Sequence, residues 1–181
     1  MSIEFKKEEK KAQVWIDTVM YTLIAFVLIG AVLAFAKPKI EEMQDKAVIE
    51  QSIGLMKDID STVMEIVQGG SGNKRILETL IKKGNLIIDA INDTLLFEIK
   101  GKYLYSEPKK EIIDGNLIIV TKERGDLKIV TITRIYDEYN ITFNNKDANK
   151  IISKASTPYK LSLTNRGKDD SDKWQVDIEI T

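Results

Sequence analysis

The pattern of apolar and polar positions changes twice along this chain. Residues 13–36 are almost continuously apolar, and Val19–Ala36 contains no charged side chain. Residues 40–68 then carry apolar side chains at every third or fourth position, which is the spacing of one helix face. After Gly72, short runs rich in Ile, Leu, Val, Thr and Tyr alternate with turn residues, as strands do. The pattern predicts an apolar helix, an amphipathic helix and a β-rich domain, in that order.

The apolar segment has the length of a membrane span. About 24 residues at ~1.5 Å each give a helix of roughly 36 Å, enough to cross a hydrocarbon core. It is long for a removable secretory signal peptide. Lys37-Pro38-Lys39 closes the segment, and Pro38 removes the hydrogen bond to the Ala34 carbonyl, which predicts a kink or a break into two helices. Residues 13–36 are therefore predicted to form one transmembrane helix.

Lysines on the two sides of this segment are nearly balanced. Four precede it (Lys6, Lys7, Lys10 and Lys11) and three follow it (Lys37, Lys39 and Lys46). Because positive charge is retained on the cytoplasmic side, the small excess favours a cytoplasmic N-terminus and an extracytoplasmic C-terminal domain.

The amphipathic segment predicts a stalk helix. Its apolar stripe consists of Val48, Ser52, Leu55, Ile59, Val63 and Ile66, widened by Ile49, Met56 and Val67. Gly69-Gly70-Ser71-Gly72 ends the helix. Two partners suit such a stripe: the β domain of the same chain, or neighbouring subunits. The two are compatible, since different levels of one helix can contact different partners.

The remaining residues predict strands with tight turns between them. The expected strands are Arg75–Lys82, Leu86–Ala90, Thr94–Lys100, Lys102–Tyr105, Asn116–Lys122, Leu127–Tyr136, Asn140–Phe143, Tyr159–Thr164 and Trp174–Ile180. Turns are expected at Asp114-Gly115-Asn116 and at Arg124-Gly125-Asp126, the second inside a hairpin. Along residues 174–180, apolar side chains alternate with Gln175, Asp177 and Glu179, which predicts one buried and one wet face. An antiparallel sheet also offers edges to neighbours, although lysine-rich edges argue against free strand addition.

The predicted fold class is α+β, with a long N-terminal helix, transmembrane and then amphipathic, followed by an antiparallel β-sandwich-like domain. Residues 1–12 are a cytoplasmic leader, 13–36 the transmembrane helix, 37–72 the stalk and its glycine-rich turn, and 73–181 the extracytoplasmic β domain.

Composition narrows the function. The 181 residues include 27 basic and 28 acidic side chains, a net charge of −1, and neither histidine nor cysteine. Without them, disulfides, thiolate chemistry, Ser-His-Asp catalysis and the usual zinc sites are excluded. The chain has no basic stripe with interleaved aromatic residues, so nucleic-acid binding is not expected. We expect no enzyme activity and no cofactor; carboxylate-only catalysis by a membrane-tethered enzyme is the remaining enzymatic alternative.

The junction before the apolar segment carries a short motif. Lys10-Lys11 forms a basic end, Ala12 is small, Gln13 follows, and Asp17 stands four residues later. At these residues the chain resembles archaeal type IV pilin-like proteins with a class III signal peptide. Ala12 replaces the more usual glycine, Trp15 is bulky, and Asp17 replaces glutamate. The matching motif covers only about residues 6–36.

The resemblance implies cleavage between Ala12 and Gln13 by a prepilin peptidase and assembly with other pilin-like subunits in a cell-surface filament or its assembly apparatus. Lys11, Ala12 and Gln13 would then form the cleavage site. The new α-ammonium of Gln13 would pair with Asp17, in the same chain or a neighbour. Alternatively, Asp17 lies close enough to the headgroups to stay hydrated. The alternative function is a permanently anchored extracytoplasmic binding or accessory domain that does not polymerise.

Three further kinds of local motif occur in the sequence. Asn92-Asp93-Thr94 and Asn140-Ile141-Thr142 fit the N-glycosylation pattern, so Asn92 and Asn140 are candidate acceptors. Arg124-Gly125-Asp126 is interpreted as a turn. Asp169-Asp170-Ser171-Asp172 resembles a solvated loop more than a calcium site, because it lacks the glycine and distal glutamate of an EF-hand.

Overall fold

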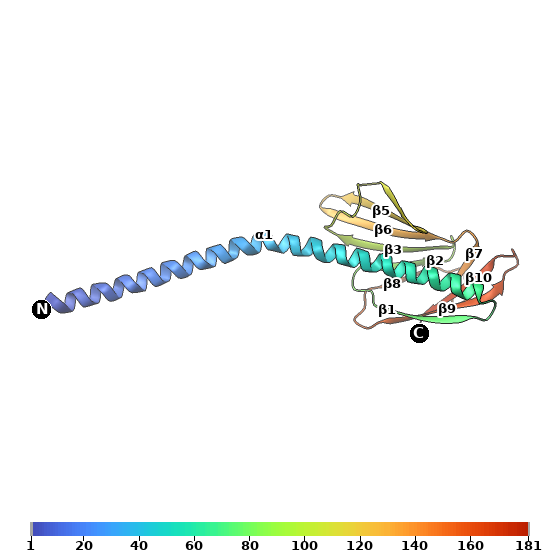
Figure 1. Ribbon diagram of the computed structural model, residues 1–181, viewed down its shortest axis with the longest axis horizontal. Helices are drawn as coiled ribbons and strands as arrows, with labels where there is room; N and C mark the ends of the chain where they lie inside the picture. Colours follow the sequence, from blue (N-terminus) through green and yellow to red (C-terminus); the bar gives the residue numbers. More distant parts are fainter. Residues whose placement is uncertain (1, 181) are drawn as a thin grey trace. The chain divides into compact units, whose positions relative to one another are not determined.

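A computed structural model describes the backbone of residues 2–180 and the side chains of residues 14–180. One helix, α1 (Ser2–Gln68), is followed by ten strands (Figure 1). The strands are β1 (Lys74–Thr79), β2 (Asn85–Asp89), β3 (Thr94–Gly101), β4 (Glu111–Asp114), β5 (Leu117–Arg124), β6 (Leu127–Ile135), β7 (Tyr139–Phe143), β8 (Lys150–Ser153), β9 (Tyr159–Lys168) and β10 (Trp174–Ile180). The chain divides into two compact units, Met1–Glu41 and Glu42–Thr181, which are described separately.

The first unit consists of helix. The predicted break at Pro38 is wrong, because α1 continues through this residue. A proline removes a single hydrogen bond from the helix, and the bonds of the neighbouring turns remain. The apolar side chains of this unit are exposed along its whole length from Val14 to Phe35.

The second unit begins with the helical residues 42–68, whose apolar stripe is buried. Ile49, Met56, Ile59, Val63 and Ile66 are at most 2% exposed and belong to the hydrophobic core formed with the strands. Within the chain, the stripe therefore packs on the β domain, which is one of the two partners expected from the sequence. The core of this unit starts at the helix and not at residue 73.

Glycines end the helix as predicted. The Gly69 amide donates to the Glu65 carbonyl (2.9 Å), and the Gly70 amide donates to the Val67 carbonyl (3.1 Å). Gly70 then takes a φ of 84°, a left-handed conformation that side chains disfavour. The chain turns here into β1.

Two sheets form the β domain. One has six strands in the order β4-β5-β6-β3-β2-β8, and the other has four in the order β1-β9-β10-β7. All neighbours are antiparallel except β10 and β7, which are parallel. Side chains from both sheets and from α1 share one core. The predicted class, α+β with a long N-terminal helix and antiparallel-rich sheets, is confirmed.

Most strands lie where the sequence placed them, although β1 ends at Thr79 instead of Lys82 and β9 continues to Lys168. Three elements differ entirely. Lys102–Tyr105 is not a strand, because the Lys102 amide donates to the Asp45 carboxylate (2.6 Å) instead of to a neighbouring strand. β4 and β8 were not predicted. Both are four-residue edge strands whose outer residues are charged or polar, so their apolar pattern is too short to distinguish from a loop. The turns at Gly115 and Gly125 are confirmed, with φ of 64° and 62°.

The predicted wet face of β10 is wrong at Asp177, which is fully buried. Its carboxylate accepts hydrogen bonds from Thr142 Oγ1 (2.9 Å) and the Asn145 amide (2.7 Å), and Arg166 lies 3.1 Å away. These partners replace water, which is why a charged side chain remains buried at an alternating position.

Candidate assembly site

The apolar surface of α1 is the main candidate for interaction with a membrane or with other helices. Among the residues that the structure describes, one helix is long and apolar enough to cross a membrane, and its apolar window near the N-terminus is entirely unburied. Tyr21 is 74% exposed and Phe35 is 80% exposed. Exposed apolar area of this extent is costly in water, so this segment needs lipid or protein around it.

The two threonine hydroxyls in this surface are satisfied inside the helix. Thr18 Oγ1 donates to the Val14 carbonyl, and Thr22 Oγ1 donates to the Thr18 carbonyl, both at 2.8 Å. Such bonds to the preceding turn let hydroxyls enter an apolar environment without an unpaired donor. The threonines are therefore compatible with a membrane or a protein core.

Asp17 is the charged side chain that stands in this surface. It is exposed and lies in a continuous helical backbone that also contains the Ala12–Gln13 junction. Positions 13 and 17 are one turn apart and thus share a helix face. The side chains of Lys11, Ala12 and Gln13 lie outside the described residues, and the predicted Gln13–Asp17 charge pair remains a prediction.

A buried ion pair fixes residues 42–68 of α1 to the six-stranded sheet. Arg134 Nε of β6 donates to Asp60 Oδ1 at 2.6 Å, and Asn116 Nδ2 donates to Asp60 Oδ2 at 2.9 Å. The side chains of Asp60 and Arg134 are 9% and 17% exposed. With both carboxylate oxygens bonded, the charge of Asp60 is compensated in a place where little water reaches it.

A second buried carboxylate, Asp45, lies about four helical turns before Asp60. Asp45 forms an ion pair with Lys83 and accepts the Lys102 amide at 2.6 Å. Burial raises the pKa of Asp45, but the Lys83 ammonium and the Lys102 amide outweigh it, so the pKa lies below the usual 3.8. A Cβ on Gly101 would lie 2.7 Å from Asp45 Cγ, so glycine is needed at this position.

Tyr136 lies beside the Asp60–Arg134 pair. The Arg134 guanidinium carbon is 4.4 Å from the centre of the Tyr136 ring. The Tyr136 hydroxyl is buried and has no hydrogen-bond partner within bonding distance among the described residues. Burial, with the Asp60 charge adding to it, raises the pKa of Tyr136 far above 10.0, so this phenol stays neutral.

Asp45 and Asp60 were missed by the sequence analysis, although a sequence signal exists. Asp45 precedes Ile49 by four residues, and Asp60 follows Met56 by four, so both carboxylates continue the buried stripe. Acidic residues at positions that a helix buries indicate partners on the opposing surface. Those partners are far apart in the sequence and cannot be identified from it.

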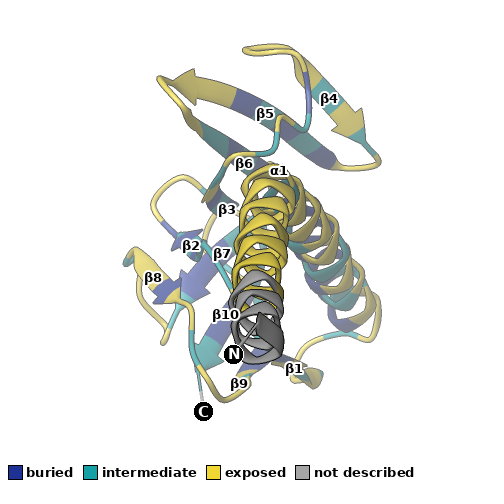
Figure 2. Ribbon diagram, turned by 90° about the vertical axis from the view of Figure 1, so that its left-hand side faces the viewer, coloured by how far each residue is buried: buried dark blue, intermediate teal, exposed yellow. Residues whose placement is uncertain are grey.

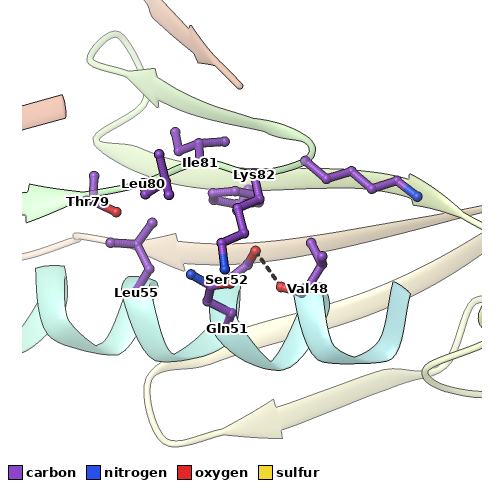
Figure 3. A pocket seen from close by; sticks show the side chains of 10 residues that line it. Val48, Gln51, Ser52, Leu55, Thr79, Leu80, Ile81 and Lys82 are labelled. Atoms are coloured by element: carbon purple, nitrogen blue, oxygen red, sulfur yellow. Dashed lines mark hydrogen bonds between the residues drawn. The ribbon is translucent and has the colours of Figure 1, made fainter. Parts of the chain in front are cut away.

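The crevice between α1 and the segment that leaves β1 is too small for a substrate. Its volume is about 30 Å³, comparable to one water molecule. Figure 3 shows Val48, Ser52 and Leu55 of α1 facing Thr79, Leu80 and Ile81, with the Ser52 hydroxyl bonded to the Val48 carbonyl at 2.8 Å. The crevice is a seam in the helix–sheet contact.

The two candidate glycosylation sites differ in accessibility. Asn92 is exposed in the turn between β2 and β3, where its Nδ2 donates to Asp89 Oδ2 (2.8 Å). Asn140 is half-buried in β7, and its Nδ2 donates to Asp169 Oδ2 (2.8 Å). Asn92 is therefore the better placed acceptor.

The acidic loop is internally bonded. Asp169 Oδ1 accepts the Ser171 amide (2.9 Å) and the Lys173 amide (3.0 Å), as in a turn built on an aspartate. The hydrogen bond from the Asn140 side-chain amide lowers the pKa of Asp169 most. Desolvation of the Asp169 carboxyl opposes this effect, and the backbone amides of Lys173 and Ser171 lower the pKa further. No group of three or more His, Cys, Asp or Glu suited to a metal ion occurs among the side chains that the structure describes.

No protein-family model, no curated protein and no solved structure matches this chain.

Proposed function

We propose that this protein is a pilin-like structural subunit of a cell-surface type IV filament or of its assembly apparatus. Its apolar helix crosses the membrane with the N-terminus in the cytoplasm and the β domain outside. A prepilin peptidase removes residues 1–12, and the mature chain begins at Gln13. The partners are the membrane, the peptidase and other pilin-like subunits.

The observation that supports this proposal most is the composition of α1 along its length. Its N-terminal part exposes a long apolar surface, whereas residues 49–66 bury their apolar side chains in the chain's own core. The exposed part thus remains available for lipid before assembly and for neighbouring helices afterwards. Both environments shield it from water, so transfer between them keeps the hydrophobic stabilisation.

Asp17 has a defined role in this proposal. Its carboxylate enters the helix core of the filament, where an unpaired charge is strongly unfavourable. The α-ammonium that cleavage creates at Gln13 compensates it, in the same chain or a neighbour. In the membrane, the same carboxylate lies near the interface, where the free-energy cost of an ionised side chain is smaller than at the bilayer centre.

Substitution of Asp17 tests this role. Asp17→Asn keeps the size of the side chain and removes its charge, so we expect normal membrane insertion and loss of incorporation into filaments. Incorporation is measured by tagging the C-terminus and comparing the sheared filament fraction with the membrane fraction.

Thr18→Val is the matched control, because the Thr18 hydroxyl is bonded within its own helix. We expect this variant to insert and assemble like the original protein. Equal incorporation of Asp17→Asn and the original chain would remove the proposed role of the carboxylate.

A permanently anchored accessory domain is the second candidate, favoured by one observation. Residues 42–180 have a core shared by the helix and both sheets, which favours a domain that folds without a neighbouring subunit. An anchored domain would be found only in membranes, with Met1 retained, and Asp17→Asn would leave its behaviour unchanged.

A further inference from the structure

The six-stranded sheet ends in two short strands of opposite charge. β4 reads Glu111-Ile112-Ile113-Asp114, and β8 reads Lys150-Ile151-Ile152-Ser153. They are the outermost strands of the sheet and lie at opposite margins of it (Figure 2). An edge strand presents unpaired backbone groups on its outer side, so each is a template for another strand.

The register aligns an apolar row between these two edges. From β4 to β8, directly opposed residues are Ile113, Ile118, Thr133, Leu96, Ile87 and Ile151. The row lies on the face opposite the core, because its sequence neighbours such as Ile119, Ile132 and Leu86 are fully buried. Its two ends are the most exposed members, Ile113 at 74% and Ile151 at 60%.

The strand directions permit continuation of the sheet by a second copy. All five neighbouring pairs in this sheet are antiparallel, so β4 and β8 run in opposite directions. A second copy placed in the same orientation beside the first therefore brings its β4 antiparallel to β8. The alternation of the sheet continues across the junction.

We propose that β4 of one copy pairs with β8 of another copy of this chain, with Ile113 opposite Ile151. This register places Ile112 beside Ile152 toward the core and Asp114 beside Lys150. The core-facing side chains of one copy therefore continue those of the next, and the solvent-facing side chains do the same. A shift by one residue would place core-facing side chains opposite solvent-facing ones. The apolar row then runs from one subunit into the next.

Charge selects this pairing over the alternatives. With the faces of the sheet kept, two β4 strands that align Ile113 with Ile113 place each Asp114 opposite Ile112, and two β8 strands that align Ile151 with Ile151 place each Lys150 opposite Ile152. Only β4 with β8 opposes Asp114 and Lys150. Asp114 Oδ1 is held by Lys57 (2.7 Å), and its second oxygen suits another cation. Lysine on an edge strand usually prevents strand addition, but here it meets an acidic edge.

The chain around β4 limits the contact to these four residues. The Lys109 amide still donates to the Thr121 carbonyl of β5 (2.8 Å), but Lys109 has a φ of 64° and the Lys110 amide donates to the Glu107 carbonyl (3.1 Å), so the regular strand begins only at Glu111. At the end of β8, the Tyr159 hydroxyl donates to the Ser153 carbonyl (3.0 Å). A carbonyl oxygen accepts two hydrogen bonds, so this contact is compatible with strand addition.

This contact goes beyond the proposed function, because it involves the β domain and does not require cleavage of the leader or contact between apolar helices. It joins two different edges, so a pair of copies still has one unused β4 edge and one unused β8 edge for further neighbours. Such head-to-tail contacts produce open assemblies unless the rotation closes a ring.

Disulfide trapping tests the pairing in the full chain, which contains no natural cysteine. Directly opposed residues on antiparallel strands have Cβ atoms about 4.5–5.5 Å apart, close to the span of a disulfide. We expect Ile113→Cys/Ile151→Cys in native membranes to give a ladder of dimers, trimers and larger species after mild oxidation. Ile113→Cys mixed with Ile151→Cys is expected to give dimers only.

Three controls make the result decisive. Ile76→Cys/Ile151→Cys, with Ile76 also 61% exposed but in the other sheet, is expected to give no ladder. Adding Lys150→Glu to the trapping pair should reduce the ladder about five- to tenfold, because attraction becomes repulsion. Adding Asp114→Lys together with Lys57→Glu, which keeps the pair within the chain, should restore it. Dimers from either single-cysteine variant alone, or an equal ladder from the Ile76 control, would overturn the proposal, as would no ladder from the trapping pair. N-terminal sequencing of the same samples shows separately whether the leader was cleaved.

Discussion

Removal of the Asp60 carboxylate is the most informative perturbation of the helix–sheet contact. Asp60→Ala leaves the Arg134 guanidinium, 17% exposed, without its buried counter-ion and leaves Asn116 Nδ2 without its acceptor. Breaking a buried pair in this way costs about 3–5 kcal/mol. Because Arg134 retains some contact with water, we expect a loss of about 2–4 kcal/mol here, a large share of the ~5–15 kcal/mol of a typical domain.

Urea unfolding of the full chain in detergent measures this loss. A Trp15→Phe background leaves Trp174 of β10 as the fluorescent reporter of the β domain. At a denaturant dependence of ~1–3 kcal/mol per molar, we expect the midpoint to fall by about 1–2 M. Asp58→Ala is the matched control, since Asp58 is exposed on the same helix, and its effect should stay within about 0.5 kcal/mol.

A second variant checks the reason for the loss. If the unpaired guanidinium causes it, Asp60→Leu combined with Arg134→Met should recover most of the stability, because both charges are then absent. An unchanged midpoint for Asp60→Ala would refute the reasoning. Equal losses for Asp60→Ala and Asp58→Ala would refute it too.

Three further predictions concern other parts of the second unit. Gly101→Ala should destabilise the protein by about 1–3 kcal/mol, because the added Cβ displaces Asp45. Gly54→Ala has nothing within 4 Å of the added Cβ and should stabilise the helix by about 0.8 kcal/mol. Thermal unfolding distinguishes the two variants. Because the pKa of Asp45 is lower in the folded state, its carboxylate stabilises the fold above pH 3.8, and this contribution disappears as the pH falls through the folded-state pKa. Asp45→Asn should therefore reduce the loss of unfolding free energy at acid pH. An unchanged dependence on pH would contradict this. In a host that glycosylates exported chains, peptide mapping should find glycan on Asn92 and not on Asn140, and modification of Asn140 alone would show that burial does not decide acceptor choice.

The sequence predicts the order of elements well because period and length carry the information. The apolar run of residues 13–36, the spacing of Ile59, Val63 and Ile66, and the glycines after Gln68 each specify local structure through nearby residues. The hairpin of β5 and β6 is predicted for the same reason, since its turn at Gly125 lies between two apolar strands.

Elements that depend on distant partners could not be predicted. Asp177 looks like a solvent-facing residue by alternation, and only Arg166 and Thr142 explain its burial. The edge strands β4 and β8 have four residues each, and their relation becomes visible only when the register of the whole sheet is known. The sequence predicts the apolar surface and the position of Asp17 in it, whereas the burial of Asp60 in the helix–sheet contact depends on Arg134, which lies 74 positions away.

The N-terminal sequence of this protein in filaments sheared from intact cells tests the central claim most directly. The proposed function predicts that the chain is present in that fraction and that its first residue is Gln13. Chains that retain Met1 and remain in the membrane fraction would contradict it, leaving an anchored domain as the better description.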